Sequence, residues 1–426
     1  MEIERNYYLK KLISKRHNGL IKIVTGIRRC GKSYLLDPIF KDYLINNGIK
    51  KNHIIKMELD SIENKKYRNP QELYSYIMNK VVDDDMYYII IDEVQKCEDF
   101  ESVLNSFLRK KNLDVYVTGS NSKFLSSDIV TEFRGRGDEI KVYPLSFKEF
   151  YSFNNNRDKG EAWKEYITYG GLPLVLLQNT VEEKVDYLNI QKNNVYINDV
   201  VERNDIQNEE ELKKLIEMIS SSIGLLTNPL KLANSFKSFD SKSTMTNKTI
   251  YNYLSYLEDS FIIEKAMRYN VKGKKYIETP QKYYFTDMGI RNSFLNFRQI
   301  EENHIMENVI YLELKRRGFS VDVGVVDVRT NSSTTKLEID FIANKGSEKY
   351  YVQSSLNLDT EEKKNQEIRP LANVNDFFKK IIIVKDDIVK YQNEQGIVIM
   401  GIYDFLLDED SLLKNWQYSF DKKLFL

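Results

Sequence analysis

Apolar and amphipathic segments alternate along the first third of the chain. Runs rich in β-branched and aromatic residues, which predict strands, occupy residues 20–24, 53–58, 86–91, 113–118 and 139–143. Apolar residues recur at helical spacing between them, so we predict helices over residues 32–46, 70–82 and 100–109. Such alternation predicts an α/β fold with a doubly wound parallel sheet. The continuously apolar run at 86–91 is typical of a strand buried on both faces.

The pattern changes after Pro144. Residues 146–223 have mostly helical spacing, interrupted at Gly170-Gly171-Leu172-Pro173. Residues 228–284 predict two short helices and then strand-like pieces, and a second α/β pattern begins near Asn303. A chain of 426 residues is too long for one ordinary core. We therefore predict four parts, over residues 1–145, 146–223, 224–295 and 296–426.

Composition narrows the functional classes. Hydrophobic residues make up 42% and charged residues 30%, as in ordinary globular proteins. Lys plus Arg and Asp plus Glu each number 63, so net charge gives no argument for a polyanionic partner, and only local patches could support one. No run of about 18 apolar residues predicts a membrane span. The charged N-terminus lacks the apolar stretch of a signal peptide, so we expect a cytoplasmic protein.

Cysteine and histidine are scarce. Cys30 and Cys97 are too few for a disulfide framework, which fits a reducing compartment. His17, His53 and His304 lie far apart in the sequence. We therefore expect neither a histidine-rich zinc site nor a catalytic triad.

A glycine-rich motif follows the first predicted strand. Residues 26–33 match the pattern G-x-x-x-x-G-K-[ST] in full. Its glycines allow backbone N–H groups to wrap phosphates, and the following helix N-terminus favours negative charge. We expect Lys32 to reach the β- and γ-phosphates of ATP and Ser33 to ligate Mg²⁺. The predicted nucleotide-binding residues are Gly26, Ile27, Arg28, Arg29, Cys30, Gly31, Lys32, Ser33 and Tyr34.

Two acids end the buried strand at residues 86–91. Asp92 is predicted to hold Mg²⁺, directly or through water. Glu93 is predicted to polarise the attacking water as a general base. Because this pair follows a phosphate-binding loop about 60 residues upstream, a catalytic role is favoured over two solvated acids at a strand end.

Further polar residues follow the next strand. Asn121 or Ser120 could contact the γ-phosphate or the attacking water, or could belong to a plain turn. Arg136 or Arg134 could reach the γ-phosphate of a neighbouring subunit, or could lie in an ordinary surface loop. Of these we predict catalytic roles for Asn121 and Arg136.

The combined motifs resemble the prokaryotic AAA+-superfamily ATPases with a C-terminal domain of unknown function. The resemblance extends over nearly the whole chain. It implies an ATPase domain, then a helical and winged-helix region, then a restriction-endonuclease-like fold. Its motifs are Ile23 to Ser33, Ile91-Asp-Glu-Val-Gln95, Thr118-Gly-Ser-Asn121, Tyr143-Pro-Leu-Ser-Phe147, Tyr169-Gly-Gly-Leu-Pro173, Glu307 to Glu313 with Arg317-Gly318, and Glu338-Ile-Asp-Phe341.

The stretch from residue 228 to residue 284 resembles a winged helix, with residues 247–259 as its recognition helix. It contains ten Lys and Arg against five Asp and Glu, an excess that can neutralise phosphates. Winged helices also serve as protein-packing modules, and lysine runs are usually solvated, so DNA contact stays one of two alternatives. The candidate DNA-binding residues are Lys248, Lys272, Lys274 and Lys275.

The last part resembles a nuclease fold whose chemistry is incomplete. Active members place an acid at one strand end, followed by an acid-x-Lys on the next strand, to bind a metal and assist the attacking water. Asp340 is present, but Gln353 replaces the acid and Ser355 replaces the lysine. We therefore predict a degenerate fold without nuclease activity, in which Glu307 and Glu338 are structural.

The leading hypothesis is an ATPase in which hydrolysis drives a conformational change, with duplex DNA as a candidate partner. A homo-oligomer or an unidentified protein partner are further candidates, and no membrane partner is expected. Two alternatives stay open: an ATP-gated DNA nuclease, and a nucleotide-switched scaffold with negligible turnover.

Overall fold

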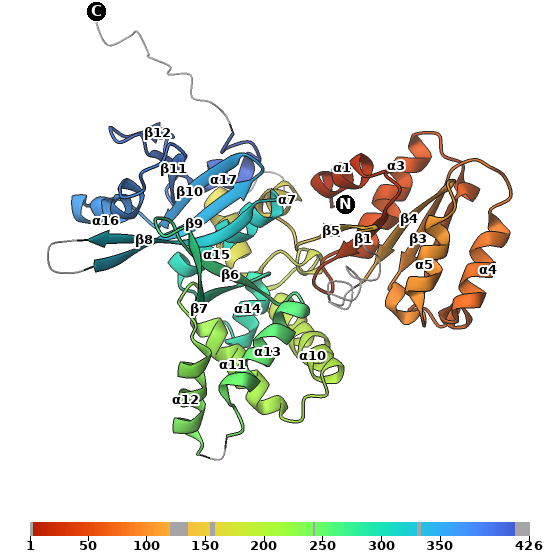
Figure 1. The fold of residues 1–426 in the computed structure, drawn as a ribbon, viewed down its shortest axis with the longest axis horizontal. Helices are drawn as coiled ribbons and strands as arrows, with labels where there is room; N and C mark the ends of the chain where they lie inside the picture. Colours follow the sequence, from red (N-terminus) through yellow and green to blue (C-terminus); the bar gives the residue numbers. More distant parts are fainter. Residues whose placement is uncertain (1–2, 120–134, 154–157, 242, 330–333, 414–426) are drawn as a thin grey trace, which may run out of the picture. The chain divides into compact units, whose positions relative to one another are not determined.

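The computed structural model describes residues 3–119, 135–153, 158–241, 243–329 and 334–413. The chain forms two compact units, coloured by sequence in Figure 1. The first contains Met1–Ala266 and Thr279–Glu301, and the second contains Met267–Glu278 and Glu302–Leu426. The predicted four-part division is finer than this and stays a prediction. Among the described residues, none of the helices is both long enough and apolar enough to span a membrane.

The first unit contains a five-stranded parallel sheet in the order β2-β3-β4-β1-β5. All six residues of β3 are buried, as its continuous apolar run predicted. Crossover connections between parallel strands usually contain a helix, which matches the alternation in the sequence. The strands are β1 (Ile21–Thr25), β2 (Ile54–Glu58), β3 (Tyr87–Asp92), β4 (Leu113–Thr118) and β5 (Gly137–Lys141).

Helices cover both faces of this sheet. On one face, Leu73 and Ile77 of α4 and Phe107 of α5 share a core with alternate residues of the strands. On the other face, the ring of Phe40 packs against those of Tyr88 and Tyr116. The predicted doubly wound α/β fold is therefore confirmed. The helices are α1 (Asn6–Ser14), α2 (Lys32–Tyr34), α3 (Lys41–Asn46), α4 (Pro70–Lys80) and α5 (Phe100–Leu108).

The helix predicted over residues 32–46 is not a regular α-helix. The chain is kinked between α2 and α3 within Leu35–Phe40, where Asp37 has the extended angles φ −144° and ψ 112° directly before Pro38. Proline lacks the backbone N–H that an α-helical ladder needs, and its ring crowds the preceding turn. The proline ring also disfavours helical angles at the residue before it, so Asp37 is extended and the helix is interrupted.

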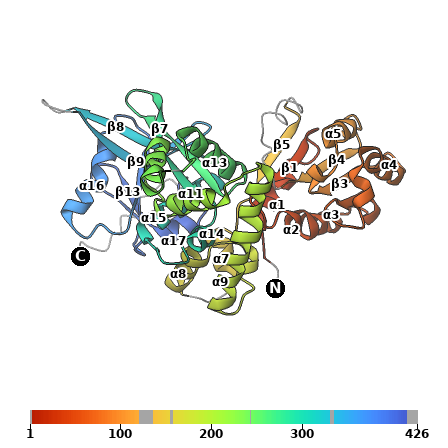
Figure 2. The same ribbon diagram turned by 90° about the horizontal axis from the view of Figure 1, so that it is seen from below.

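A helical region follows the sheet within the first unit. Figure 2 shows α8 and α9 close to each other and to α14, and all three are in contact. The elements are α7 (Phe147–Phe153), α8 (Lys159–Tyr169), α9 (Val181–Ile190), the π-helical turn Gln191–Ile197, α10 (Asn198–Arg203), α11 (Glu209–Ser221) and α14 (Met288–Phe294).

A buried carboxylate fixes α14 to the Gly170-Gly171 loop. Asp287 caps α14 by accepting a hydrogen bond from the backbone N–H of Ile290 at 3.0 Å, and it accepts another from Gly171 at 2.7 Å. A Cβ atom on Gly170 would lie 2.2 Å from Asp287 Oδ1. Gly170 also has φ +76°, so only glycine suits this position.

Residues 228–284 contain two helices and then a hairpin, in the order that the sequence predicted. Helix α12 (Pro229–Phe239) packs on α13 (Asn247–Asp259). Strands β6 (Ile263–Asn270) and β7 (Lys275–Phe285) follow, and the lysine-rich turn lies between them. The winged-helix assignment of these elements stays a prediction.

The second unit is built on a mixed sheet. The strand order is β12-β13-β11-β10-β9-β8-β6-β7, in which β8, β9 and β10 are antiparallel and β10, β11 and β13 are parallel. Its elements are α15 (Glu302–Arg316), β8 (Ser320–Arg329), β9 (Thr334–Lys345), β10 (Glu348–Ser355), α16 (Glu361–Ala372), β11 (Lys379–Val384), β12 (Tyr391–Gln392), β13 (Val398–Gly401) and α17 (Ile402–Leu407).

Candidate active site

The glycine loop joins the end of β1 to the start of α2. Gly26 has φ +137°, and a Cβ atom there would lie 2.1 Å from the carbonyl oxygen of Val142. Glycine is therefore required for the loop to pass this close to the chain after β5. Cys30 packs beneath the loop, with its thiol 3.4 Å from the same carbonyl oxygen. The side chains of Ile27 and Cys30 are buried and support the loop from below.

Lys32 lies inside the loop. Its side chain is 6% exposed, and its ammonium group donates hydrogen bonds to the carbonyl oxygens of Gly26 at 2.9 Å and Ile27 at 3.1 Å. These contacts hold the ammonium group against the loop backbone, which is the part of the motif predicted to bind phosphates.

Ser33 and Asp92 meet at the carboxyl edge of the sheet. The Ser33 hydroxyl donates a hydrogen bond to Asp92 Oδ1 at 3.0 Å. The Thr118 hydroxyl, at the end of β4, donates to the same oxygen. Burial raises the pKa of Asp92 above its ordinary value, and these two hydrogen bonds offset that effect only in part. A buried carboxylate with two hydroxyl neighbours can accept a hard cation such as Mg²⁺.

Glu93 follows Asp92 in a left-handed conformation, with φ +51°. Its backbone N–H donates to the Thr118 hydroxyl at 3.0 Å, and its carboxylate accepts a hydrogen bond from the Gln95 side chain. Non-glycine residues seldom adopt positive φ, and such positions cluster at functional sites. Here the conformation turns Glu93 out of the strand, and its side chain lines the pocket described next.

A pocket of about 720 Å³ contains the sites of Lys32, Ser33, Asp92 and Glu93. Its volume lies in the range of small-molecule and cofactor sites. The predicted residues Arg28, Arg29, Gly31 and Tyr34 also line it. Apolar side chains from the helical region complete its wall: Pro173, Leu174, Leu177 and Val195.

The helical region also contacts the glycine loop directly. Arg28 forms an ion pair with Asp199 of α10 at 2.8 Å, and Arg203 pairs with the same carboxylate at 2.8 Å. The hydroxyl of Tyr196 donates to the backbone carbonyl of Arg28 at 3.0 Å. Burial raises the pKa of Asp199, and the two arginines offset this only in part. The loop is thus held by helices that come much later in the chain.

Of the four candidate residues that follow β4, the structure describes only Arg136. Asn121, Ser120 and Arg134 lie outside the described residues. Arg136 is described, but it does not line the pocket. Its guanidinium contacts the Asn105 side chain at 3.4 Å, and its carbonyl oxygen accepts a hydrogen bond from Ile21.

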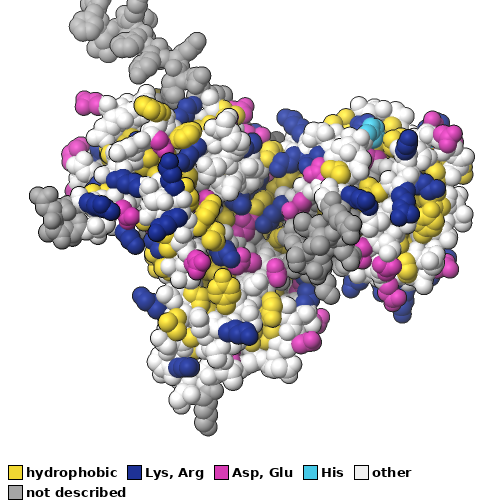
Figure 3. Space-filling model, viewed as in Figure 1, with side chains coloured by type: hydrophobic (Ala, Val, Ile, Leu, Met, Phe, Trp, Pro, Cys, Tyr) yellow, Lys and Arg dark blue, Asp and Glu magenta, His cyan; other side chains and the backbone are white. Residues whose placement is uncertain are grey.

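The four candidate DNA-binding lysines divide between the units. Lys248 lies on α13 of the first unit, and Lys272, Lys274 and Lys275 lie at the hairpin turn of the second. Lys272 donates a hydrogen bond to the carbonyl oxygen of Asp327 at 2.9 Å. Figure 3 shows Lys and Arg mixed with Asp and Glu on the displayed face, not gathered into one continuous patch.

The predicted nuclease-like positions line a pocket of about 580 Å³ in the second unit. The Gln353 side chain accepts a hydrogen bond from the backbone N–H of Asp340 at 3.3 Å. The backbone N–H of Ser354 donates to the Asp340 carboxylate at 2.8 Å. The residues that line this pocket include Glu307, Glu338, Asp340, Gln353, Ser355 and Lys363.

Sequence reasoning missed three residues of the first pocket's surroundings. Thr118 stands in the quoted Thr118-Gly-Ser-Asn121 motif, so its position at a strand end beside Asp92 was a usable signal. Asp199 and Tyr196 carry no motif that marks them. Both contact Arg28, and Tyr196 lies 168 positions from it in the chain. Contacts over such a separation become visible only in the folded structure.

Two protein families match this chain. Residues 18–151 match the family described as AAA domain. Residues 160–301 match a domain of unknown function. The first match covers the five-stranded sheet with the glycine loop and Asp92, and the second covers the helical region with Asp199 and Asp287.

Two relatives can be aligned with most of the chain. An uncharacterized protein of Haemophilus influenzae is 34% identical over 413 residues, 95% of this chain and 98% of the relative. An uncharacterized protein of Methanocaldococcus jannaschii is 30% identical over 358 residues, 80% of this chain and 74% of the relative. A solved Walker-type ATPase of Pyrococcus abyssi is 15% identical, with a TM-score of 0.49, over 69% of this chain and 96% of that one. The matched AAA domain, the glycine loop and the adjoining domain show that the chain belongs to the prokaryotic AAA+ P-loop ATPases that carry a second domain of unknown function.

Proposed function

We propose that this protein binds ATP with Mg²⁺ and hydrolyses the nucleotide at the carboxyl edge of the five-stranded sheet. The proposal rests on the 3.0 Å hydrogen bond between Ser33 and Asp92. In P-loop NTPases the loop hydroxyl and a strand-end aspartate together hold Mg²⁺. Their contact brings both groups to one point beside Lys32 in a pocket of sufficient volume.

Each residue has a separate role in this proposal. Lys32 binds the β- and γ-phosphates, and Ser33 with Asp92 holds the metal. Glu93 orients and polarises the attacking water. Asn121 contacts the γ-phosphate or the water. Arg136 acts on the nucleotide of a neighbouring subunit, which makes a homo-oligomer part of the proposal.

Nucleotide state is coupled to the helical region through Arg28. The loop backbone and this side chain both contact the helical region, at Tyr196 and Asp199 respectively. A γ-phosphate would compete with Asp199 for Arg28, because both are anionic and the guanidinium binds one such group well at a time. Hydrolysis would then return Arg28 to Asp199 and shift α10.

ATP turnover by wild type, Lys32→Ala and Glu93→Gln tests the proposal. We expect Lys32→Ala to lose binding and turnover, and Glu93→Gln to bind ATP but lose turnover. Glu98→Gln is the matched control, because it removes an exposed carboxylate five residues away. Wild-type turnover in Glu93→Gln would refute its role, and ATP binding without turnover in the wild type would favour the nucleotide-switched scaffold.

Duplex DNA is the proposed macromolecular partner. The lysines of the hairpin turn support this, because phosphate contacts by lysine supply sequence-independent affinity. Lys274→Ala with Lys275→Ala should weaken binding of a fluorescent duplex and reduce its salt dependence. The same pair of changes at Lys110 and Lys111, both exposed on the first unit, is the control. Equal affinity of both variants and wild type would remove DNA contact by this turn from the proposal.

One observation favours DNA cleavage as a second candidate function. Four acids and two lysines line one pocket: Glu307, Glu338, Asp340, Glu367, Lys336 and Lys363. Gln353 and Ser355 weigh against it, because they lack the metal-binding charge and the activating cation. Nicking of plasmid DNA with Mg²⁺ or Mn²⁺ that disappears in Asp340→Ala would establish this activity. Its absence in the wild type leaves the pocket without nuclease chemistry.

A further inference from the structure

A second group of metal-ligand side chains lies at the opposite edge of the sheet from Asp92. His53 ends the 3₁₀ turn Lys51–His53, directly before β2. Asp83 and Asp85 lie between α4 and β3. Because β2 and β3 are adjacent and parallel, the segments that precede them meet at the same edge. Asp92 ends β3, so this group is separate from the nucleotide pocket.

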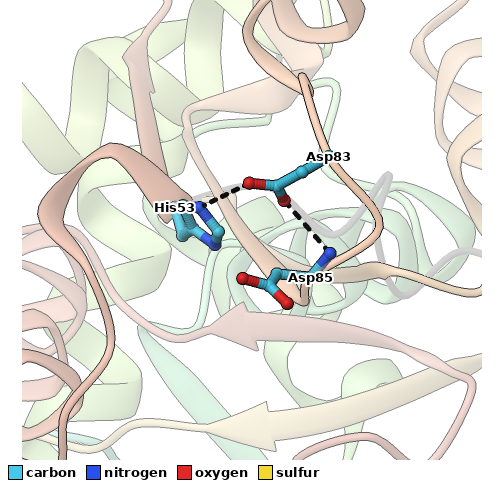
Figure 4. A group of neighbouring side chains, drawn as sticks. All are labelled: His53, Asp83 and Asp85. Atoms are coloured by element: carbon cyan, nitrogen blue, oxygen red, sulfur yellow. Dashed lines mark hydrogen bonds and ion pairs between the residues drawn. The ribbon is translucent and has the colours of Figure 1, made fainter.

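The three side chains converge on one point. Figure 4 shows the carboxylates of Asp83 and Asp85 beside the imidazole of His53, and one ligand atom from each lies within 4.8 Å of the other two. His53 Nε2 lies 3.3 Å from Asp83 Oδ2. The backbone N–H of Asp85 donates to Asp83 Oδ1 at 3.1 Å, which fixes the turn that brings the two aspartates together.

His53 gives the cluster a polar atom that lacks a hydrogen bond. The residue is 3% exposed, and its ring stacks on that of Tyr87 with centroids 4.3 Å apart. Its Nε2 atom is buried, and among the described residues it makes no hydrogen bond. Asp83 Oδ2 lies within ion-pair distance of Nε2, but the two atoms do not form a hydrogen bond. A buried polar atom without a hydrogen bond is unfavourable, so a ligand at this atom would stabilise the folded protein.

The ligand set selects a class of cation. Imidazole nitrogen with carboxylate oxygen suits Zn²⁺ and neighbouring transition metals, whereas Mg²⁺ and Ca²⁺ prefer oxygen alone. Tetrahedral Zn²⁺ with bonds of about 2.0–2.2 Å holds its ligand atoms about 3.4 Å apart. Asp83 and Asp85 are exposed and can rotate to close the remaining distance. Lys50, whose ammonium lies 3.2 Å from Asp85 Oδ2, is 65% exposed and would move into solvent.

We propose that His53, Asp83 and Asp85 bind one divalent transition metal ion of the zinc class, with water in the remaining position. The ion would join the start of β2 to the segment before β3 through side chains on both. Because it binds only the folded arrangement, it would stabilise the first unit increasingly as the free metal concentration rises above the dissociation constant.

Cobalt(II) absorption and thermal unfolding test this site. Full-length protein, stripped with chelator and kept free of nucleotide, is titrated with Co²⁺ and, in parallel, with Zn²⁺. We expect one ion per chain, a visible absorption band and a higher unfolding temperature, with no equivalent shift from Mg²⁺. Asp83→Asn should weaken binding at least about tenfold, since even the loss of a second-shell partner costs about 10–100-fold.

Two further variants make the test specific. Asp84→Asn removes an exposed carboxylate between the proposed ligands and should leave the affinity unchanged. Asp92→Asn should also leave it unchanged, because that residue belongs to the nucleotide site. Any of three outcomes would overturn the proposal: equal metal affinities of the wild type and Asp83→Asn, loss of the ion in Asp92→Asn, or no metal binding by the wild type. His53→Gln should lose the absorption band, and a folded His53→Gln protein that keeps it would have the same effect.

Discussion

Thr118 and Asp92, which end neighbouring strands β4 and β3, are joined through a hydrogen bond from the threonine hydroxyl to Asp92 Oδ1. The same hydroxyl accepts a hydrogen bond from the backbone N–H of Glu93 at 3.0 Å. One side chain therefore holds both the proposed metal ligand and the residue proposed to activate water. Its position depends on the parallel pairing of the two strands.

Replacing Thr118 should test this link. In Thr118→Val the hydroxyl is lost while the shape is kept, which removes one of the two hydroxyl hydrogen bonds to Asp92 Oδ1 and the hydrogen bond from the backbone N–H of Glu93. The loss of these contacts should lower the free energy of unfolding by about 1–3 kcal/mol. We expect kcat for ATP hydrolysis to fall roughly tenfold or more, measured by phosphate release. Thr118→Ser should keep most of the activity, and a Thr118→Val enzyme with wild-type kcat would contradict the assignment.

Asp199→Asn should strengthen ATP binding severalfold. The substitution removes the anion that pairs with Arg28, so this arginine, which lines the pocket, becomes available to phosphate. Titration with a fluorescent ATP analogue at low and high salt measures this, and the gain should shrink with salt. Glu202→Gln is the control, because it removes an exposed charge from the same helix. Weaker binding in Asp199→Asn would show that the Arg28 contact supports the loop instead of restraining it.

Gly170→Ala should destabilise the first unit by about 1–3 kcal/mol, the cost of overpacking a well-packed site. The new Cβ would lie 2.2 Å from Asp287 Oδ1 in a backbone of φ +76°. Gly48→Ala separates these two effects, because Gly48 has φ +87° but no atom within 4 Å of such a Cβ. Chemical denaturation should show a clearly larger loss for Gly170→Ala, and equal losses would mean that the backbone conformation alone matters.

Asp287 should make stability depend on pH. Burial raises its pKa from 3.8 to about 6, although hydrogen bonds from Gly171, Ile290 and Gly289 oppose the shift. Between these two values the folded state binds more protons than the unfolded state, so this group's contribution to stability increases as pH falls from about 7 to about 4. The shift corresponds to at most about 3 kcal/mol.

The comparison with Asp287→Asn isolates that contribution, because other titrating groups cancel in the difference. The free energy of unfolding of the wild type minus that of the variant should increase as pH is lowered across this window. A difference that stays constant with pH would show that the carboxylate titrates at its ordinary value.

The second unit contains a buried ion pair that should be sensitive to removal of one partner. Glu313 is buried and accepts hydrogen bonds from Arg316 and, at 2.8 Å, from Arg317. Burial alone would raise the pKa of Glu313. The two guanidinium groups lower it by more than burial raises it, so the pKa lies below its ordinary value. Glu313→Gln should cost about 3–5 kcal/mol, because it leaves buried cations uncompensated. Limited proteolysis should detect the loosened unit, and exposed Glu394→Gln should match the wild type.

The sequence by itself determined the phosphate loop, the buried strand before Asp92 and the alternation that defines a doubly wound sheet. These features are local: a strand, a glycine turn and a helix N-terminus follow one another within about a dozen residues, so short-range patterns specify them. The order of helices and hairpin in residues 228–284 was predictable for the same reason. The irregular turn within residues 32–46 was not predicted, although Pro38 marked it.

Only the tertiary structure decided which distant residues complete the site. Thr118 meets Asp92 because β4 pairs with β3, and Asp199 meets Arg28 because α10 packs against the glycine loop. His53, Asp83 and Asp85 converge because two parallel strands begin at the same edge. Such contacts depend on packing between segments far apart in the chain, and hydrophobic periodicity carries no record of which segments will pack together.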